Sequence, residues 1–201
     1  MLQSRLTTNN KMKRIYTHSI QLSATEKDNK VIVKTNSEVN TINLDIKVPQ
    51  RFSVNIKSID QGNIYVVNLN GEMEISNNDG DVKILRASGS AVINTLDGDI
   101  FVKFIEVSVD VPMAFSAMDG TIDVTFPEDL KAFLKIKSDY GKIFSDFEMN
   151  IEKRKLKTEK SDDTGIYKVS LEDWTCGRIN GGEAEIRLNS VDGNIFIRKQ
   201  D

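Results

Sequence analysis

Glycine recurs at a fixed interval in the middle of this chain, and this interval constrains the fold more than any other feature. The glycines stand nine residues apart, at Gly62, Gly71, Gly80, Gly89 and Gly98. The second and fourth residues after each glycine are apolar, as at Ile64 and Val66. A turn glycine followed by a strand of period two, repeated at constant length, is typical of a chain that winds into stacked β-coils.

A fuller form of the repeat places a turn residue before the glycine and Ile or Val two residues after it. Its glycines are Gly62, Gly80, Gly98, Gly120, Gly141 and Gly193. Most of these phrases contain Asp-Gly, which favours turns because glycine adopts positive φ and the carboxylate bonds to nearby backbone. The sequence therefore predicts an all-β, single-stranded β-solenoid, similar to a β-helix, with coils of about 18–22 residues.

An antiparallel meander is the main alternative, because Asp-Gly and Asn-Gly also favour two-residue hairpins. A meander does not need corners at a constant spacing. Stacked coils do, because each strand lies about 4.8 Å from its equivalent in the next coil. The constant interval therefore favours the solenoid.

The first part of the chain lacks the glycine phrase, and we expect residues 1–50 to form a polar tail and an irregular β cap continuous with the solenoid. Strand-like runs occur at Thr17–Ala24, Lys30–Asn36 and Thr41–Val48, the last ended by Pro49. A cap is expected because an open end of the stack exposes unpaired backbone groups. Residues 51–201 carry the coils, interrupted at about 146–173 by a densely charged excursion that we interpret as a long hairpin returning through Ile166–Leu171.

Composition excludes several classes of protein. The chain has 27 basic and 30 acidic residues, which gives no overall positive field for nucleic acid. No apolar run is long enough to span a membrane, and Met1–Leu6 lacks the apolar segment of a secretory signal. Cys176 is the single cysteine, so no internal disulfide forms, and a low aromatic content predicts a core of Ile, Val and Leu.

The chain resembles the bacterial putative-adhesin family, a domain of unknown function built from short β-repeats. The resemblance rests on the Asp-Gly-Asp-Ile phrases, on Val111–Gly120, Phe126–Ala132 and Ser145–Phe147, and on the closing Gly177–Ile186, and it covers roughly residues 40–200. It implies a β-solenoid and association with the cell envelope or exterior. It brings no catalytic residues.

Carboxylates flank the corner glycines at Asp79, Asp81, Asp97, Asp99, Asp119 and Asp192. Coils in register would align these into columns that offer oxygen ligands to a cation such as Ca²⁺. The Gly-Gly-x-Gly-x-Asp motif of calcium-binding β-rolls is absent, and Asp in a turn normally bonds to its own backbone. We therefore interpret the carboxylates as turn residues and expect no metal and no cofactor.

The same carboxylates raise the possibility of a polysaccharide lyase or hydrolase, which needs closely spaced acids in a cleft. Short, even coils leave little room for a cleft, and the single histidine, His18, lies outside the regular coils. We expect no catalytic residues and no enzyme activity. A small packed residue is the expected role of Cys176, and Trp174 is expected to cover the solenoid edge.

The third residue after each fuller-phrase glycine is expected to point outward. These positions hold Tyr65, Lys83, Phe101, Asp123, Phe144 and Phe196. Four aromatic residues among six outward positions are unusual for a solvated face, so Tyr65, Phe101, Phe144 and Phe196 form the candidate binding face. The alternative, which aggregation risk favours, is that the N-terminal strands or the excursion cover this column.

The sequence thus predicts a non-catalytic binding or adhesion-like module of the bacterial envelope or surface, whose protein or glycan partner and oligomeric state it does not specify. The alternatives are a structural docking domain in a protein assembly and, more distantly, a carbohydrate-active enzyme. A smooth prism without converging carboxylates would favour the binding module or the docking domain over the enzyme.

Overall fold

The computed structural model describes residues 21–36, 41–108, 110–152, 156–160, 167–171 and 174–200, and every regular element in these ranges is a β-strand. The prediction of an all-β protein is confirmed. The chain divides into two units, Met1–Lys47 and Val48–Asp201.

The N-terminal unit contains one antiparallel hairpin. Strands β1 (Gln21–Lys27) and β2 (Lys30–Asn36) pair through a two-residue turn, in which Asp28 and Asn29 have positive φ values of 53° and 59°. The strand expected at Thr41–Val48 is wrong, because these residues form no regular element despite their alternating pattern. Alternation predicts which side chains share a face but supplies no partner for the ladder. The strand expected at Thr17–Ala24 begins outside the described residues. The role of residues 1–50 as a cap on the solenoid stays a prediction.

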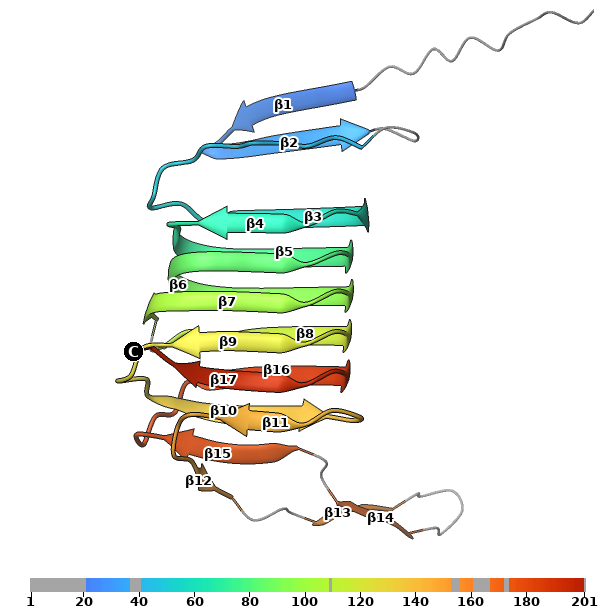
Figure 1. Cartoon of the computed structure of the whole chain (residues 1–201), viewed down its shortest axis with the longest axis vertical. Helices are drawn as coiled ribbons and strands as arrows, with labels where there is room; N and C mark the ends of the chain where they lie inside the picture. Colours follow the sequence, from blue (N-terminus) through green and yellow to red (C-terminus); the bar gives the residue numbers. More distant parts are fainter. Residues whose placement is uncertain are drawn as a thin grey trace, which may run out of the picture. The chain divides into compact units, whose positions relative to one another are not determined.

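The second unit is a sheet curled into two faces (Figure 1). The first face contains the strands that follow the fuller-phrase glycines, and the second contains those that precede them. On the first face lie β4 (Ile64–Val67), the first part of β6 (Val82–Asp97), β7 (Ile100–Val107), β9 (Ile122–Phe126), β17 (Ile195–Lys199) and β11 (Ile143–Ser145). On the second lie β3 (Val54–Gln61), β5 (Asn70–Asp79), the later part of β6, β8 (Met113–Asp119), β16 (Glu185–Asp192) and β10 (Ala132–Ser138).

The pairs along both faces are parallel, so equivalent residues of neighbouring coils lie side by side and form columns. The inward columns are apolar and buried, for example Val82, Ile100, Ile122 and Ile195 on the first face. Phe104, Phe115 and Phe126 are also buried, with ring centroids 5.5–6.5 Å apart. The expectation of a core without large rings is therefore wrong here. Phe104 and Phe115 lie in the longer coil between Gly98 and Gly120, whose extra residues widen the interior.

The coils do not stack in the order of the sequence. The C-terminal pair β16–β17 lies between β8–β9 and β10–β11, as the red, yellow and orange strands of Figure 1 show. β17 pairs with β9 on one side and with β11 on the other, and β16 pairs with β8 and β10. Among the described strand pairs, β10 and β11 therefore pair only with strands that come later in the chain.

Antiparallel pairing ends the second face. β15 (Thr175–Ile179) pairs antiparallel with β10, and the short β12 (Asn150–Ile151) pairs antiparallel with β15. Within the charged excursion, β13 (Leu156–Lys160) and β14 (Tyr167–Leu171) form an antiparallel hairpin. Arg178 on β15 pairs with Glu152 and with Glu183, and both raise the pKa of its guanidinium. The Arg178–Glu152 pair connects the base of the excursion to the sheet.

Corner glycines stack directly on one another in the order Gly62, Gly80, Gly98, Gly120, Gly193 and Gly141. Gly98 has a φ of 136°, and a Cβ placed on it would lie 2.3 Å from the carbonyl oxygen of Gly80. Only a residue without a side chain allows the two coils to approach this closely. The nine-residue interval thus reflects a steric requirement between coils as well as a turn within one.

We predict that Gly98→Ala lowers the free energy of unfolding by roughly 3 kcal/mol, since the backbone must shift to accept the Cβ. Gly181→Ala is the matched control, because Gly181 also has positive φ (68°) but a Cβ added to it would meet no atom within 4 Å. It should cost about 1 kcal/mol, the conformational penalty alone. Urea unfolding followed by circular dichroism measures both, and equal losses would contradict the stacking argument.

Candidate binding face

The outward positions of the first face form one column in register. In stacking order the column reads Tyr65, Lys83, Phe101, Asp123, Phe196 and Phe144, each paired laterally with the next. All four residues of the candidate binding face therefore stand in one line. The order differs from that of the sequence because β17 lies between β9 and β11.

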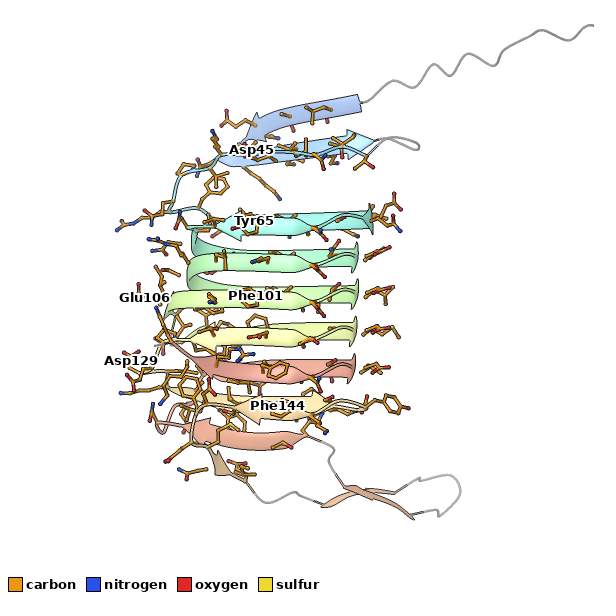
Figure 2. The ribbon with its side chains drawn as sticks, in the orientation of Figure 1. Asp45, Tyr65, Phe101, Glu106, Asp129 and Phe144 are labelled. Carbon is orange, nitrogen blue, oxygen red and sulfur yellow. The ribbon has the colours of Figure 1, made fainter. Side chains whose placement is uncertain are left out.

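The aromatic residues of this column differ in exposure. Tyr65 is 62% exposed and Phe144 is 47% exposed, whereas Phe101 and Phe196 are half-buried. Figure 2 shows Tyr65, Phe101 and Phe144 along one side of the stack. Within Val48–Asp201, the described residues leave the rings of Tyr65 and Phe144 open to solvent, and cover by the N-terminal strands stays a prediction. Whether they bind a ligand stays a prediction.

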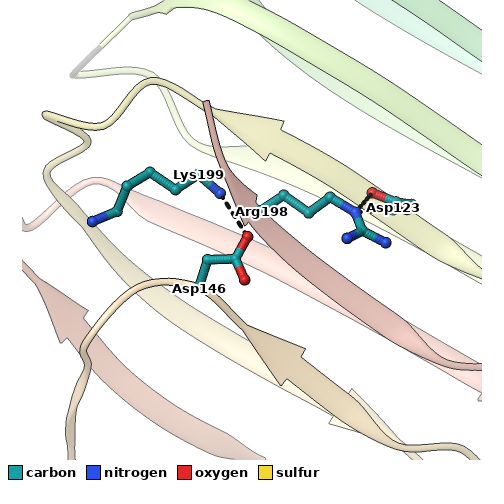
Figure 3. Close-up of polar contacts among 4 residues, drawn as sticks. All are labelled: Asp123, Asp146, Arg198 and Lys199. Carbon is teal, nitrogen blue, oxygen red and sulfur yellow. Dashed lines mark hydrogen bonds and ion pairs between the residues drawn. The ribbon is translucent and has the colours of Figure 1, made fainter. Parts of the chain in front are cut away.

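The half of the column nearest the C-terminal coil is engaged in contacts within the protein. The rings of Phe144 and Phe196 stack with centroids 4.9 Å apart, and the Arg198 guanidinium lies 5.0 Å from the centroid of Phe196. Arg198 Nε donates to both carboxylate oxygens of Asp123, at 2.8 and 3.0 Å, which raises the pKa of the guanidinium (Figure 3). The backbone N–H of Lys199 donates to Asp146. These contacts hold β17 between β9 and β11.

The other half of the column carries cations that have no acidic partner among the described residues. The Nζ atoms of Lys83 and Lys103 lie 5.4 and 5.5 Å from the centroid of the Phe101 ring. Both lysines are exposed, and in the described part of the chain neither forms an ion pair. Tyr65 lies beside Lys83 on the neighbouring strand. We call Tyr65, Lys83, Phe101 and Lys103 the basic–aromatic quartet.

Sequence reasoning identified the column but missed Lys103 and Arg198. Each stands two residues after a column member on the same strand, so it points to the same side of the sheet. The period-two rule was the available signal, since it applies to outward positions as much as to inward ones.

Two of the corner carboxylates, Asp81 and Asp99, bond to the neighbouring coil rather than to their own turn. Asp81 Oδ1 accepts the backbone N–H of Asp99 at 3.0 Å, and Asp99 Oδ1 accepts that of Thr121 at 2.7 Å. Asn63 and Asn194 make the same bond with their amide oxygens. The assignment of Asp81 and Asp99 to local turn bonding is therefore wrong, and that of Asp79, Asp97, Asp119 and Asp192 stays a prediction. An acceptor side chain at this position satisfies a backbone donor one coil away. We call Asn63, Asp81, Asp99 and Asn194 the corner acceptor ladder.

Within the described ranges, no group of three or more His, Cys, Asp and Glu side chains is placed to hold a metal ion. His18 lies outside these ranges. No helix in the described part of the chain has the length and apolarity needed to cross a membrane. Trp174 and Cys176 are both half-buried, so Cys176 is less enclosed than expected, and the Arg187 guanidinium lies 5.8 Å from the Trp174 ring centroid.

The Toastrack DUF4097 family model matches residues 53–198. The chain belongs to this family. The match covers the whole curled sheet, with its corner glycines and basic–aromatic quartet. Among solved structures, a putative cell adhesion protein from Clostridium sporogenes shares 9% sequence identity, with a TM-score of 0.49 over 90% of this chain and 76% of that one. No curated protein matches the chain.

We predict that Asp99→Ala lowers the free energy of unfolding by about 1 kcal/mol because the Thr121 N–H loses its acceptor. Asp99→Asn should retain most of the stability, since Asn63 and Asn194 already fill this role. Thermal unfolding with and without Ca²⁺ separates the ladder from a cation site. A calcium-dependent rise in Tm that Asp99→Asn abolishes would contradict the ladder.

Proposed function

We propose that this protein is a non-catalytic binding module that recognises a partner through its outward aromatic column. The observation that supports this proposal is the exposure of Tyr65 and Phe144 at opposite ends of the column. Near Tyr65, the column also holds Lys83, with Lys103 beside it, and neither lysine has an acidic partner among the described residues. Large exposed rings beside cations are typical of recognition surfaces rather than of solvated sheet faces.

The fold suits this role. We interpret the curled sheet as a single-stranded β-solenoid in which one coil, β16–β17, inserts out of sequence order. Its parallel register repeats one outward position about every 4.8 Å, so a ligand with a repeating structure meets a similarly spaced array of side chains. The envelope or the cell exterior is the proposed location, in keeping with the resemblance to adhesin-like domains.

A structural docking domain is the second candidate. The observation that favours it is a pair of exposed apolar residues on the second face, Leu96 and Met118, which are 53% and 55% exposed. An enzymatic function is not proposed, because Asp81 and Asp99 each use one carboxylate oxygen to accept a backbone hydrogen bond within the stack.

A glycan array tests the binding module, with the purified full chain as probe. We predict that wild type binds a subset of glycans and that Tyr65→Ser/Phe144→Ser reduces this binding by about tenfold, the effect of losing roughly 1.4 kcal/mol of contact energy. Tyr65 is largely exposed, whereas Phe144→Ser also removes the stacking on Phe196, so circular dichroism must show that the double variant keeps the fold before its binding is compared.

Leu96→Ser/Met118→Ser is the matched control, because it removes a similar exposed apolar area from the other face. Equal loss of binding in the two double variants would show that the column is not the site. Loss in the control alone would transfer the site to the second face and favour the docking domain.

A further inference from the structure

We infer that the basic–aromatic quartet binds an acidic polysaccharide, one whose sugars carry carboxylates. This inference rests on the proposed function and narrows it to one part of the column and one class of ligand. Two features carry it: the charge of Lys83 and Lys103, which no described carboxylate neutralises, and their placement around an aromatic ring beside the exposed Tyr65.

The charges of this face are arranged unequally. Arg198 has a carboxylate partner in Asp123. Lys83 and Lys103, on the adjacent strands β6 and β7, have none among the described residues and lie against the same ring. A cation with a protein carboxylate loses that partner when it binds a ligand, whereas these two ammonium groups lose only water and a weak ring contact. The quartet is therefore where an external anion gains most.

Neighbouring carboxylates restrict where that anion can lie. Asp81 and Asp99 stand in the corners two residues before Lys83 and Phe101, just ahead of β6 and β7, with one oxygen each in the corner acceptor ladder. An anionic ligand is repelled from that side. It is attracted toward Lys103, where the neighbouring positions in register are the uncharged Leu85 and Thr125. The charges thus favour an anionic ligand and also favour its position on the Lys103 side of the quartet.

The remaining side chains favour a sugar polymer over an acidic peptide. Sugar rings present C–H groups that pack on exposed aromatic rings such as Tyr65, and one sugar spans roughly one strand spacing of about 4.8 Å. A chain lying along the stack would place one sugar on Tyr65 and the next over Lys83. A peptide usually gains affinity by adding a strand to a free sheet edge. β6 and β7, which carry Lys83, Phe101 and Lys103, are paired on both sides, so a peptide over the two lysines would have only side-chain contacts. Tyr65 lies on β4, which pairs with β6 alone among the described strands, so strand addition could occur only beyond the lysines.

Polygalacturonate and its fully methyl-esterified form are suitable probes, because they share a backbone and differ in charge. We predict that the full-length protein binds polygalacturonate in isothermal titration calorimetry, with affinity that falls as NaCl is raised. The methyl ester should bind at least about tenfold more weakly.

Lys83→Ala/Lys103→Ala should reduce polygalacturonate affinity by about tenfold or more. Lys83→Arg/Lys103→Arg keeps both positive charges and should bind polygalacturonate about as tightly as wild type. Lys57→Ala/Lys131→Ala removes two exposed lysines outside the first face and should leave the affinity unchanged. Asp81→Asn/Asp99→Asn keeps the ladder acceptors, removes two negative charges and should increase the affinity by several-fold.

The inference is overturned if polygalacturonate does not bind, if the ester binds equally well, or if the control lysines matter as much as the quartet lysines. Stronger binding of poly-L-glutamate through the same lysines would assign the face to an acidic peptide instead. Glycan-array binding that depends on Tyr65 and Phe144 but extends only to neutral sugars would overturn this inference while leaving the proposed function standing.

Discussion

Backbone hydrogen bonds at the glycine corner determine the rest of the structure. The N–H of Gly80 donates to the carbonyl of Asp97 at 2.8 Å, and that of Gly98 donates to the carbonyl of Asp119 at 2.9 Å. Each bond forms only because no Cβ separates the corners. The pairing fixes one register for the whole coil, and therefore decides which side chains align inside the core and which align on the surface.

The same corner explains how a late part of the chain enters the middle of the stack. The N–H of Gly120 donates to the carbonyl of Asp192 at 2.9 Å, just as Gly98 donates to Asp119. Small polar side chains support the corner from inside, where Ser190 Oγ donates to the Gly120 carbonyl and Ser138 Oγ to that of Gly193. Because the Gly120 corner offers the same donor as the Gly80 and Gly98 corners, the C-terminal coil fits beside it in the same register. On the other side of this coil, the N–H groups of Asp139 and Tyr140 donate to the carbonyls of Ser190 and Val191 instead.

The sequence predicted the register but not the order of the coils. Periodicity identifies the residues that turn corners and those that face inward, and from these the outward column of Tyr65, Phe101, Phe144 and Phe196 follows. It contains no information on which coil lies next to which, since Gly141 and Gly193 carry equivalent phrases. For that reason the stacking of Phe144 on Phe196 and the pairing of Arg198 with Asp123 were not predictable.

The hydrogen bonds of the corner carboxylates Asp81 and Asp99 could not be predicted from one coil alone. A turn residue examined within its own coil suggests a bond to its own backbone, whereas Asp81 and Asp99 satisfy donors one coil away. The same two carboxylates then shape the surface potential beside Lys83. The part of the binding face that depends on a single strand was predictable, and the part that depends on contacts between strands required the structure.

Disulfide trapping tests directly whether β17 lies between β9 and β11. In a Cys176→Ser background, cysteines at Asp123 and Phe196 would stand on adjacent strands about 4.8 Å apart, whereas those at Asp123 and Phe144 would be two strands and about 10 Å apart. A disulfide requires Cα atoms within about 7 Å. We predict that Asp123→Cys/Phe196→Cys crosslinks on oxidation while Asp123→Cys/Phe144→Cys does not. Crosslinking of the second pair and not the first would show that the coils follow the order of the sequence.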